Sequence, residues 1–312
     1  MTRHFLEVDD LTPDELEEVL ALASVPAGFL PRTLEDQGAA LVFEKPSVRT
    51  RNSTELAVVA LGGHPVYIQG PEVGIDTRET AEDVARTLAC YHAVICGRVL
   101  DHRVLVRMAA ALDAAGLDVP VVNLLSDRAH PCQALADLLT LRQAFPDTAG
   151  LTLAYIGDAN NVWRSLAIAA AMTGIAFRTA SPDGYGPGPE DLARLAGLGL
   201  DHLVTTDPAG AAAGADALYT DVWTSMGQEE ESARRLRDFA GFTVDEALLA
   251  RAAPHAVVLH CLPAHRGEEV SAGVLESPRS LVWPQAANRM HAVRGLLAWL
   301  GGARPDDDGD LP

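Results

Sequence analysis

Short apolar runs alternate along this chain with segments that have the spacing of amphipathic helices. We expect strands at Ala40–Phe43, Pro65–Ile68, Ala93–Cys96, Pro120–Asn123, Leu151–Ile156, Ile175–Thr179, Ala217–Tyr219 and Ala256–His260. Most of these runs are continuous rather than alternating, which is typical of parallel strands covered by helices on both faces. The pattern therefore predicts an α/β fold with crossover connections. Sheets of this kind bind ligands at the carboxyl ends of their strands.

The chain has 312 residues, which is long for one hydrophobic core and usual for two. A helix with an apolar face is expected over His130–Phe145, and it is our candidate for a bridge between domains. We predict two domains, each a mostly parallel sheet flanked by helices, joined by bridging helices. The predicted division gives residues 1–131 and 287–303 to one domain and 132–286 to the other, and leaves 304–312 as a disordered acidic tail.

Composition excludes several classes of partner. The net charge of −19 disfavours binding to nucleic acid or to anionic membranes. The four cysteines show no Cys-x-x-Cys spacing, as expected of a reduced cytosolic protein. The N-terminal residues lack the apolar core of a signal peptide, and the longest apolar run, Ala167–Phe177, is too short to span a bilayer. We therefore expect a cytoplasmic protein.

Residues Phe43–Arg51 read Phe-Glu-Lys-Pro-Ser-Val-Arg-Thr-Arg and lie where an expected strand turns into an expected helix. Free backbone N–H groups and the helix dipole favour an anion at such a point. Two hydroxyls and two guanidiniums are added there, from Ser47, Thr50, Arg49 and Arg51. Guanidinium binds phosphate oxygens two at a time. We interpret the segment as a phosphate site; the alternative is a capped helix start with solvated arginines.

His130 and Gln133 are three residues apart at the start of the expected bridging helix, so both can face one cleft. Together they can donate to a carbonyl oxygen and stabilise the charge that develops on it. The alternative is a helix cap beside a surface amide. Arg98 follows the expected strand Ala93–Cys96 and can add a positive group, although a lone Arg in such a place is more often structural.

Two further motifs end strands in the second half of the chain. Gly157–Val162 lacks the second and third glycines of a dinucleotide fingerprint, which argues against NAD binding. It leaves Asn160 and Asn161 as amide ligands or as turn residues. Asp221–Glu230 offers Asp221 for an ammonium group and a Ser-Met-Gly loop that can close over a ligand. A capped helix entrance is the alternative.

The segment His260–Gly267 begins His-Cys-Leu-Pro-Ala-His, an order that suggests zinc. No second ligand pair has the right spacing, and Pro263 redirects the chain between the histidines. We therefore favour Cys261 as a residue at a strand end near a substrate amine. Arg289, at the start of the C-terminal helix, can return an arginine to the site.

Taken together, these segments resemble the ornithine carbamoyltransferases of the aspartate/ornithine carbamoyltransferase superfamily. The resemblance covers about residues 1–303 and rests on five motifs in the expected order: Phe43–Arg51, His130–Gln133, Gly157–Asn161, Asp221–Glu229 and His260–Pro263. The first two are shared with all carbamoyltransferases, whereas Asp-x-x-x-Ser-Met-Gly and His-Cys-Leu-Pro indicate ornithine rather than aspartate. The resemblance implies transfer of the carbamoyl group of carbamoyl phosphate to the δ-amine of L-ornithine, giving citrulline and phosphate. It also implies a trimer or multiple of trimers, with no metal and no cofactor.

The resemblance further implies roles for individual residues. It assigns carbamoyl phosphate to Ser47, Val48, Arg49, Thr50, Arg98, His130, Gln133, Cys261, Leu262 and Arg289, and ornithine to Asn161, Asp221, Ser225 and Met226. Catalytic roles fall to Arg98 and His130, which would serve the oxyanion, and to Cys261, which would orient the amine. The domain of residues 1–131 and 287–303 would bind carbamoyl phosphate, and the domain of residues 132–286 ornithine. Arginine biosynthesis is the implied role, with ornithine breakdown left open.

Two departures from the family pattern stand out. The usual Ser-Thr-Arg-Thr-Arg is Ser-Val-Arg-Thr-Arg here, so Val48 replaces a hydroxyl and only its backbone N–H can serve. Glu72–Glu79 also differs, in a region from which many relatives lend a residue to the neighbouring subunit. Three alternatives remain: transfer to another amine such as putrescine or a modified ornithine, a non-catalytic binding protein of the same fold, and a zinc hydrolase.

Overall fold

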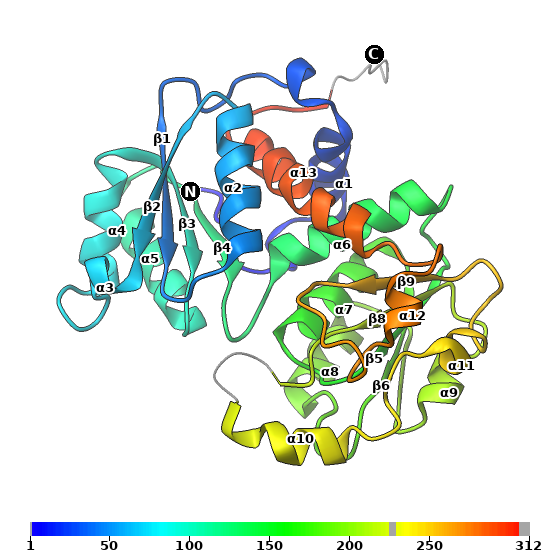
Figure 1. Ribbon diagram of the computed structural model, residues 1–312. Helices are drawn as coiled ribbons and strands as arrows, with labels where there is room; N and C mark the ends of the chain where they lie inside the picture. Colours follow the sequence, from blue (N-terminus) through cyan, green and yellow to red (C-terminus); the bar gives the residue numbers. More distant parts are fainter. Residues whose placement is uncertain (1, 225–228, 306–312) are drawn as a thin grey trace. The chain divides into compact units, whose positions relative to one another are not determined.

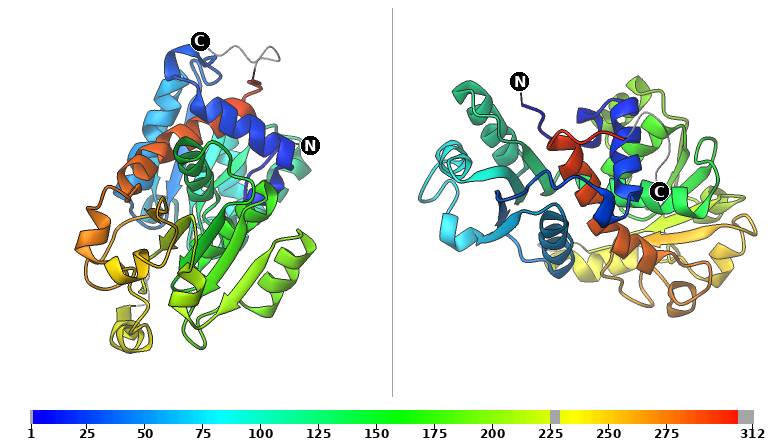
Figure 2. Two further views of the ribbon diagram at one scale, coloured as in Figure 1. Left: turned by 90° about the vertical axis from the view of Figure 1, so that its right-hand side faces the viewer. Right: turned by 90° about the horizontal axis from the view of Figure 1, so that it is seen from above.

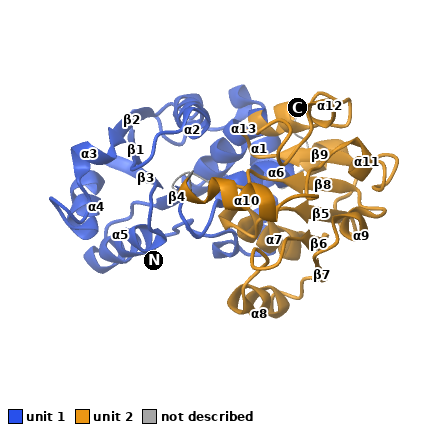
Figure 3. Cartoon of the chain, turned by 60° about the horizontal axis from the view of Figure 1, so that its bottom comes forward, with its two compact units in different colours: residues 1–139, 287–312 blue, residues 140–286 orange. Residues whose placement is uncertain are grey.

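The structure is a computed structural model that describes residues 2–224 and 229–305. The chain divides into two compact units, residues 1–139 with 287–312 (unit 1) and residues 140–286 (unit 2) (Figure 3). The first division falls after Leu139, well inside helix α6 (Pro131–Ala144), whereas the predicted division, after residue 131, falls at the first residue of that helix. The reason is that Cys132 and Gln133, in the first turn of α6, bond to residues of unit 1. Most of the expected acidic tail lies outside the described residues.

Unit 1 contains a four-stranded parallel sheet in the order β2-β1-β3-β4. Its strands are β1 Gly38–Phe43, β2 His64–Gln69, β3 His92–Arg98 and β4 Val121–Leu125. Its helices are α1 Pro13–Ser24, α2 Val48–Ala60, α3 Gly70–Val73, α4 Ala81–Ala89, α5 His102–Ala115, the first turns of α6 and most of α13 (Val282–Leu300), with short 3-10 helices at Val8–Asp10 and Ala27–Phe29. Helices α4 and α5 cover one face of the sheet, and α1, α2 and α13 lie on the other (Figure 1).

Strand β1 shows why the apolar runs of the sequence are continuous. Every residue from Ala39 to Phe43 is buried. Ala40 and Val42 pack in one core with residues of α4 and α5, so the alternate side chains point to the opposite, helix-covered face. A strand that is buried on both faces gains from apolar residues at every position. The expectation of parallel strands between helical layers is confirmed.

Unit 2 contains a five-stranded parallel sheet in the order β7-β6-β5-β8-β9. Its strands are β5 Thr152–Ile156, β6 Ala176–Ala180, β7 His202–Thr205, β8 Ala217–Thr220 and β9 Val257–His260. Its helices are α7 Asn161–Thr173, α8 Pro189–Gly197, α9 Pro208–Ala212, α10 Ser232–Asp238, α11 Glu246–Leu249 and α12 Ala272–Leu275, with a 3-10 helix at Glu229–Glu231. Helices α7 and α8 cover one face, and α9, α11 and α12 the other; Figure 2 shows these layers from two further directions.

Strand β7 was not expected from the sequence. It is an edge strand that pairs with β6 alone, and Leu203 and Val204 remain 49% and 43% exposed. A strand that buries so little contains no long apolar run, so periodicity does not reveal it.

None of the helices in the described part of the chain combines the length and apolar character that a membrane crossing needs.

Helices α1 and α13 of unit 1 cross at a glycine. A Cβ atom built on Gly295 would lie 2.5 Å from the backbone N of Ala23 and 2.7 Å from the carbonyl oxygen of Val19. Both neighbours are backbone atoms, which cannot turn aside as a flexible side chain can. The absence of a side chain at Gly295 therefore sets how closely the two helices approach.

We predict that Gly295→Ala destabilises the protein by about 1–3 kcal/mol, the usual cost of overpacking a filled interface. The matched control is Gly197→Ala in α8, where a new Cβ atom meets nothing within 4 Å. That change should be neutral or stabilise by up to about 1 kcal/mol, because alanine favours the helix. Urea unfolding followed by tryptophan fluorescence measures both. Equal stability of the two variants would contradict the close crossing.

Candidate active site

The carboxyl ends of three neighbouring strands gather the predicted phosphate residues of unit 1. Phe43 at the end of β1 pairs with Arg98 at the end of β3, and Arg98 pairs with Leu125 at the end of β4. The chain then leads from β1 into α2 and from β4 to His130. Strand β1 has β2 on one side and β3 on the other, so the strand order reverses there. Ligands of open α/β sheets bind at such a reversal.

The start of α2 has the geometry of an anion site. Ser47 is the N-cap, and its Oγ accepts from the backbone N of Thr50 at 3.3 Å. Val48 follows with a side chain that is 77% exposed, so its contribution is limited to its backbone N–H. Arg49 is half-buried, and its side chain makes no hydrogen bond or ion pair with the described residues. Its guanidinium is therefore available to a ligand.

Arg51 is occupied elsewhere. Its Nε donates to Glu55 Oε1 at 2.8 Å, and its guanidinium lies 3.9 Å from the ring centre of Tyr67. The bond with Glu55 lies within α2, and the contact with Tyr67 joins α2 to β2. Of the two arginines in the motif, Arg49 fits the role of a phosphate ligand and Arg51 a structural role.

The hydroxyl of Thr50 is the centre of the cluster. Its Oγ1 accepts from Arg289 Nη2 at 2.9 Å, from Ser47 Oγ at 3.1 Å and from Arg98 Nη1 at 3.4 Å. Thr50, Arg98 and Arg289 are 2%, 5% and 6% exposed. Two almost buried guanidiniums thus converge on one oxygen atom, at the N-terminus of a helix. This arrangement favours a ligand with several negatively charged oxygens.

His130 and Gln133 join the cluster through Arg289. Arg289 Nη1 donates to Gln133 Oε1 and lies 3.4 Å from His130 Nε2. A guanidinium only donates, so Nε2 accepts in this arrangement. Gln133 Nε2 donates to Asp137 Oδ1 at 2.7 Å. The buried Asp137, one turn later, thus holds one of the two amide hydrogens of Gln133, whose oxygen faces Arg289, and the second amide hydrogen is left for the predicted donation to a carbonyl.

The electrostatics of this cluster keep the imidazole neutral. Burial lowers the pKa of His130 well below its usual value, and Arg289, Arg98 and Arg49 lower it further. The neighbouring thiol is inert, because burial raises the pKa of Cys132 to about 12. A neutral imidazole among arginines suits hydrogen bonding to a polarised carbonyl better than proton transfer near neutral pH.

The second set of predicted residues lies in unit 2, around Asp221. Asp221 directly follows β8, is 5% exposed and accepts three hydrogen bonds. The donors are Asn160 Nδ2 at 2.8 Å, the backbone N of Val222 at 2.8 Å and Cys261 Sγ at 2.9 Å. The carboxylate is thereby fixed in orientation. It retains lone pairs with which to bind an amine.

Asn160 holds Asp221 in place, a role that the sequence analysis did not predict for it. Its Oδ1 caps α7 by accepting from the backbone N of Val162 and Trp163 at 2.9 and 3.1 Å, which turns its amide nitrogen to Asp221. The signal was an Asn directly before a helix, which we interpreted as a ligand or a turn. Asn161, the predicted ligand, is the first residue of α7 and is half-buried.

Cys261 and Leu262 follow β9 and lie in unit 2 with Asp221, not with the residues of unit 1 that share their assignment to carbamoyl phosphate. Leu262 has a φ of 59°, a conformation that costs free energy for a side chain of this size. Its backbone N donates to His260 Nδ1 at 2.8 Å, which holds it there. Ser225 and Met226, the remaining predicted ornithine ligands, lie outside the described residues.

One group of metal-ligand type includes two of these residues. Asp221, His260 and Cys261 place ligand atoms within 4.8 Å of one another. Each atom already has a protein partner: Cys261 bonds to Asp221, and the two ring nitrogens of His260 bond to Leu262 N and, at 3.1 Å, to Glu269. His265 belongs instead to an outer group with Glu268 and Glu269. The geometry is that of a hydrogen-bonded network, which does not favour the zinc interpretation.

Comparison with known proteins matches this division of residues. A family model described as the aspartate/ornithine carbamoyltransferase carbamoyl-P binding domain matches residues 3–143. A second, described as the Asp/Orn binding domain of the same family, matches residues 149–300.

Individual relatives agree over nearly the whole chain. An ornithine carbamoyltransferase of Acidothermus cellulolyticus is 50% identical over 96% of this chain and 97% of its own length. The solved ornithine carbamoyltransferase of Thermus thermophilus superposes with a TM-score of 0.86 at 44% identity, covering 96% of this chain and 99% of that chain. The enzyme of Pyrococcus furiosus gives a TM-score of 0.90 at 40% identity, covering 97% and 98%. By motifs, fold and similarity, the chain belongs to the aspartate/ornithine carbamoyltransferase family.

Proposed function

We propose that this protein transfers the carbamoyl group of carbamoyl phosphate to the δ-amine of L-ornithine, giving L-citrulline and phosphate. The observation that carries the proposal is the convergence of Arg98 and Arg289 on Thr50 at the start of α2. A dianion with a carbonyl group fits a site that combines buried guanidiniums, helix N–H groups and a neutral imidazole. The relatives named above, which carry the name ornithine carbamoyltransferase, support the acceptor.

Carbamoyl phosphate is assigned to unit 1. Its phosphate would accept from Ser47, Arg49, Thr50 and Arg289 and from the backbone N–H of Val48. Its carbonyl oxygen would lie by Arg98 and His130, and its amide would donate to Gln133 Oε1. Donation from His130 needs the ring proton on Nε2, so its contact with Arg289 has to give way when phosphate draws that guanidinium.

Ornithine is assigned to unit 2. Asp221, with Cys261 and Leu262 beside it, would orient the δ-amine, and Asn161, Ser225 and Met226 would hold the rest of the molecule. The nitrogen lone pair of the neutral amine attacks the carbonyl carbon, and a C–N bond forms. The oxyanion of the tetrahedral intermediate then re-forms the carbonyl as the C–O bond to phosphate breaks. The amine loses one proton to solvent or to the leaving phosphate, and the protein contributes positioning and charge stabilisation.

The acceptor is the part of the proposal to test first. Citrulline formation from carbamoyl phosphate should be measured with ornithine, putrescine and N-acetylornithine side by side. We expect a clear preference for ornithine. If putrescine or N-acetylornithine is carbamoylated faster, that amine and not ornithine is the acceptor. No transfer to any of the three would favour the non-catalytic alternative.

We further propose three finer properties: a homotrimer or multiple of trimers, a cytoplasmic location, and a role in arginine biosynthesis. Exposed Leu56 and Val59, three residues apart on α2, support association of subunits. The four cysteines are all free, which supports a reducing compartment. Sedimentation equilibrium of the purified protein tests the assembly.

We predict that Arg49→Ala loses about 3–5 kcal/mol of transition-state stabilisation, because it removes two or three charge-assisted hydrogen bonds to phosphate. Arg51→Ala is the matched control, since that guanidinium is held by Glu55 and Tyr67. It should change kcat/KM by no more than about fivefold, or roughly 1 kcal/mol. Steady-state citrulline assays measure both. Similar losses in the two variants would contradict a phosphate role for Arg49.

We predict that the rate at subsaturating ornithine rises from about pH 6 to pH 8, because the attacking amine must be neutral and a free alkylamine titrates near ~10.4. His130 should add no acidic limb in this range, since burial and three arginines keep its pKa well below the usual value. A pH profile of kcat/KM measures this. A flat profile, with chemistry shown to limit the rate, would exclude simple amine attack.

A further inference from the structure

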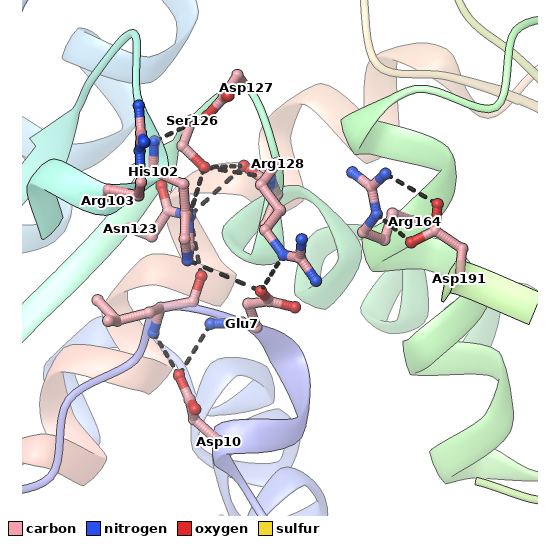
Figure 4. A network of polar contacts seen from close by, with 12 residues as sticks. Glu7, Asp10, His102, Arg103, Asn123, Ser126, Asp127, Arg128, Arg164 and Asp191 are labelled. Atoms are coloured by element: carbon pink, nitrogen blue, oxygen red, sulfur yellow. Dashed lines mark hydrogen bonds and ion pairs between the residues drawn. The ribbon is translucent and has the colours of Figure 1, made fainter. Parts of the chain in front are cut away.

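The turn that delivers His130 is built by its own network of hydrogen bonds (Figure 4). Ser126 and Ala129 close the turn: the backbone N of Ser126 donates to Ala129 O at 2.9 Å, and the backbone N of Ala129 donates to Ser126 Oγ at 3.1 Å. Asn123 Nδ2 also approaches Ser126 Oγ, at 3.2 Å. Ser126 and Asn123 are fully buried. The position of Ser126 therefore determines the path of the chain into His130.

A histidine from another element holds this serine. His102, the first residue of α5, places Nδ1 2.8 Å from Ser126 Oγ, and its backbone N donates to Asp127 Oδ1 at 2.8 Å. Glu7, in the N-terminal segment, lies beside the imidazole of His102. Glu7 Oε1 is 3.7 Å from His102 Nε2. The same carboxylate accepts from Arg128 Nε at 2.9 Å. Two elements thus fasten the turn, and neither contains a residue assigned to substrate.

The directions of these bonds follow from the available protons. Ser126 Oγ has one proton and two acceptor positions, and the N–H groups of Ala129 and Asn123 point at the acceptor positions. Of the two acceptors described for the hydroxyl proton, His102 Nδ1 lies at 2.8 Å and Ala129 O at 3.4 Å, so we assign the proton to the shorter contact, with His102 Nδ1. Nδ1 accordingly has no proton, and the ring proton lies on Nε2, toward Glu7.

The surroundings keep the ring in this neutral form. Burial lowers the pKa of His102. Glu7, Asp127 and Asp10 oppose this shift, and Arg128 adds to it. A proton on Nδ1 would remove the acceptor that Ser126 needs and would force the hydroxyl to turn.

We infer that His102 is a positioning residue: as an acceptor at Nδ1 it fixes Ser126, and through the turn Ser126–Ala129 it sets the place of His130 against the carbonyl group of the substrate. The inference rests on the proposed function. It assigns His102 no contact with substrate, phosphate or the reacting atoms.

In the proposed mode of binding, the two ends of carbamoyl phosphate lie at different parts of unit 1. The phosphate is held by the start of α2, whereas the carbonyl lies by Arg98 and His130. Displacing the turn should therefore weaken the binding of a ligand that has both a phosphate-like group and a carbonyl. The binding of inorganic phosphate should not change. Loss of general structural integrity would weaken both ligands together.

The test uses the full-length protein with two stable probes, inorganic phosphate and phosphonoacetamide, which keeps a carbonyl and an amide. His102→Leu removes the acceptor and Ser126→Ala removes the hydroxyl. His102→Asn keeps an acceptor where Nδ1 lies. Ser24→Ala is the matched control, because the Ser24 hydroxyl donates to Leu20 O at 2.9 Å within α1.

We expect His102→Leu and Ser126→Ala to weaken the binding of phosphonoacetamide by about 10- to 100-fold and to lower kcat by a similar factor. This is the usual cost of misplacing a catalytic group by about 1 Å. Phosphate affinity should stay within about twofold, and His102→Asn should recover most of the loss. Ser24→Ala should behave as the unaltered protein. An unchanged phosphonoacetamide affinity, or an equal loss for both probes, would overturn the inference.

A measurement on the unaltered protein tests the inference even if His102→Leu does not fold. Nitrogen-15 NMR of the unaltered protein, labelled at histidine, should show His102 with an unprotonated Nδ1 and a protonated Nε2 at neutral pH. The reverse tautomer would overturn the inference even if the variants lose activity. Failure of the proposed function has a different signature: the unaltered protein would then bind phosphate but neither bind phosphonoacetamide nor form citrulline.

Discussion

Unit 1 holds two like charges close together inside protein, since Arg98 and Arg289 are both almost fully buried and share the hydroxyl of Thr50. Burying a guanidinium is costly unless its donors are matched and its charge is balanced. The protein matches donors with Thr50 and Gln133, and it places the carboxylate of Asp137 behind Gln133. That leaves positive charge in excess. An anion that completes the balance gains more free energy here than it would from solvated arginines.

The same logic explains how an acidic protein of net charge −19 binds an anion. Long-range attraction is absent, so the site depends on short, directed bonds rather than on steering. Sheet topology supplies the directions. In unit 1 the strand order reverses at β1, where the ends of β1 and β3 are adjacent. In unit 2 it reverses at β5, and the Asn160–Asp221 hydrogen bond lies between the ends of β5 and β8. Each reversal opens space that the following helices do not fill.

The sequence predicts those parts of the structure that rest on burial and on chain order. The strands buried on both faces, such as β1, and the helix over residues 130–145 were recognisable because apolar spacing reports burial. Strand β7 was not, since Leu203 and Val204 are exposed. The orientation of individual side chains could not be predicted from the sequence either. Nothing local tells that Asp137 turns the amide of Gln133, or that Asn160 rather than Asn161 holds Asp221, because these depend on residues that the fold brings together.

The discontinuity of unit 1 has a consequence for how the protein is made. Residues 1–139 leave the ribosome first, but their unit also needs residues 287–312, which include Arg289 and the Gly295 contact with α1. Unit 2 is continuous and is complete before those residues are synthesised. Domains generally fold as units during synthesis, so the nascent chain exposes an unfinished unit 1 while unit 2 is already able to fold. The anion site closes last, when the final helix arrives, and a chain that stops short of α13 has no Arg289 with which to bind phosphate.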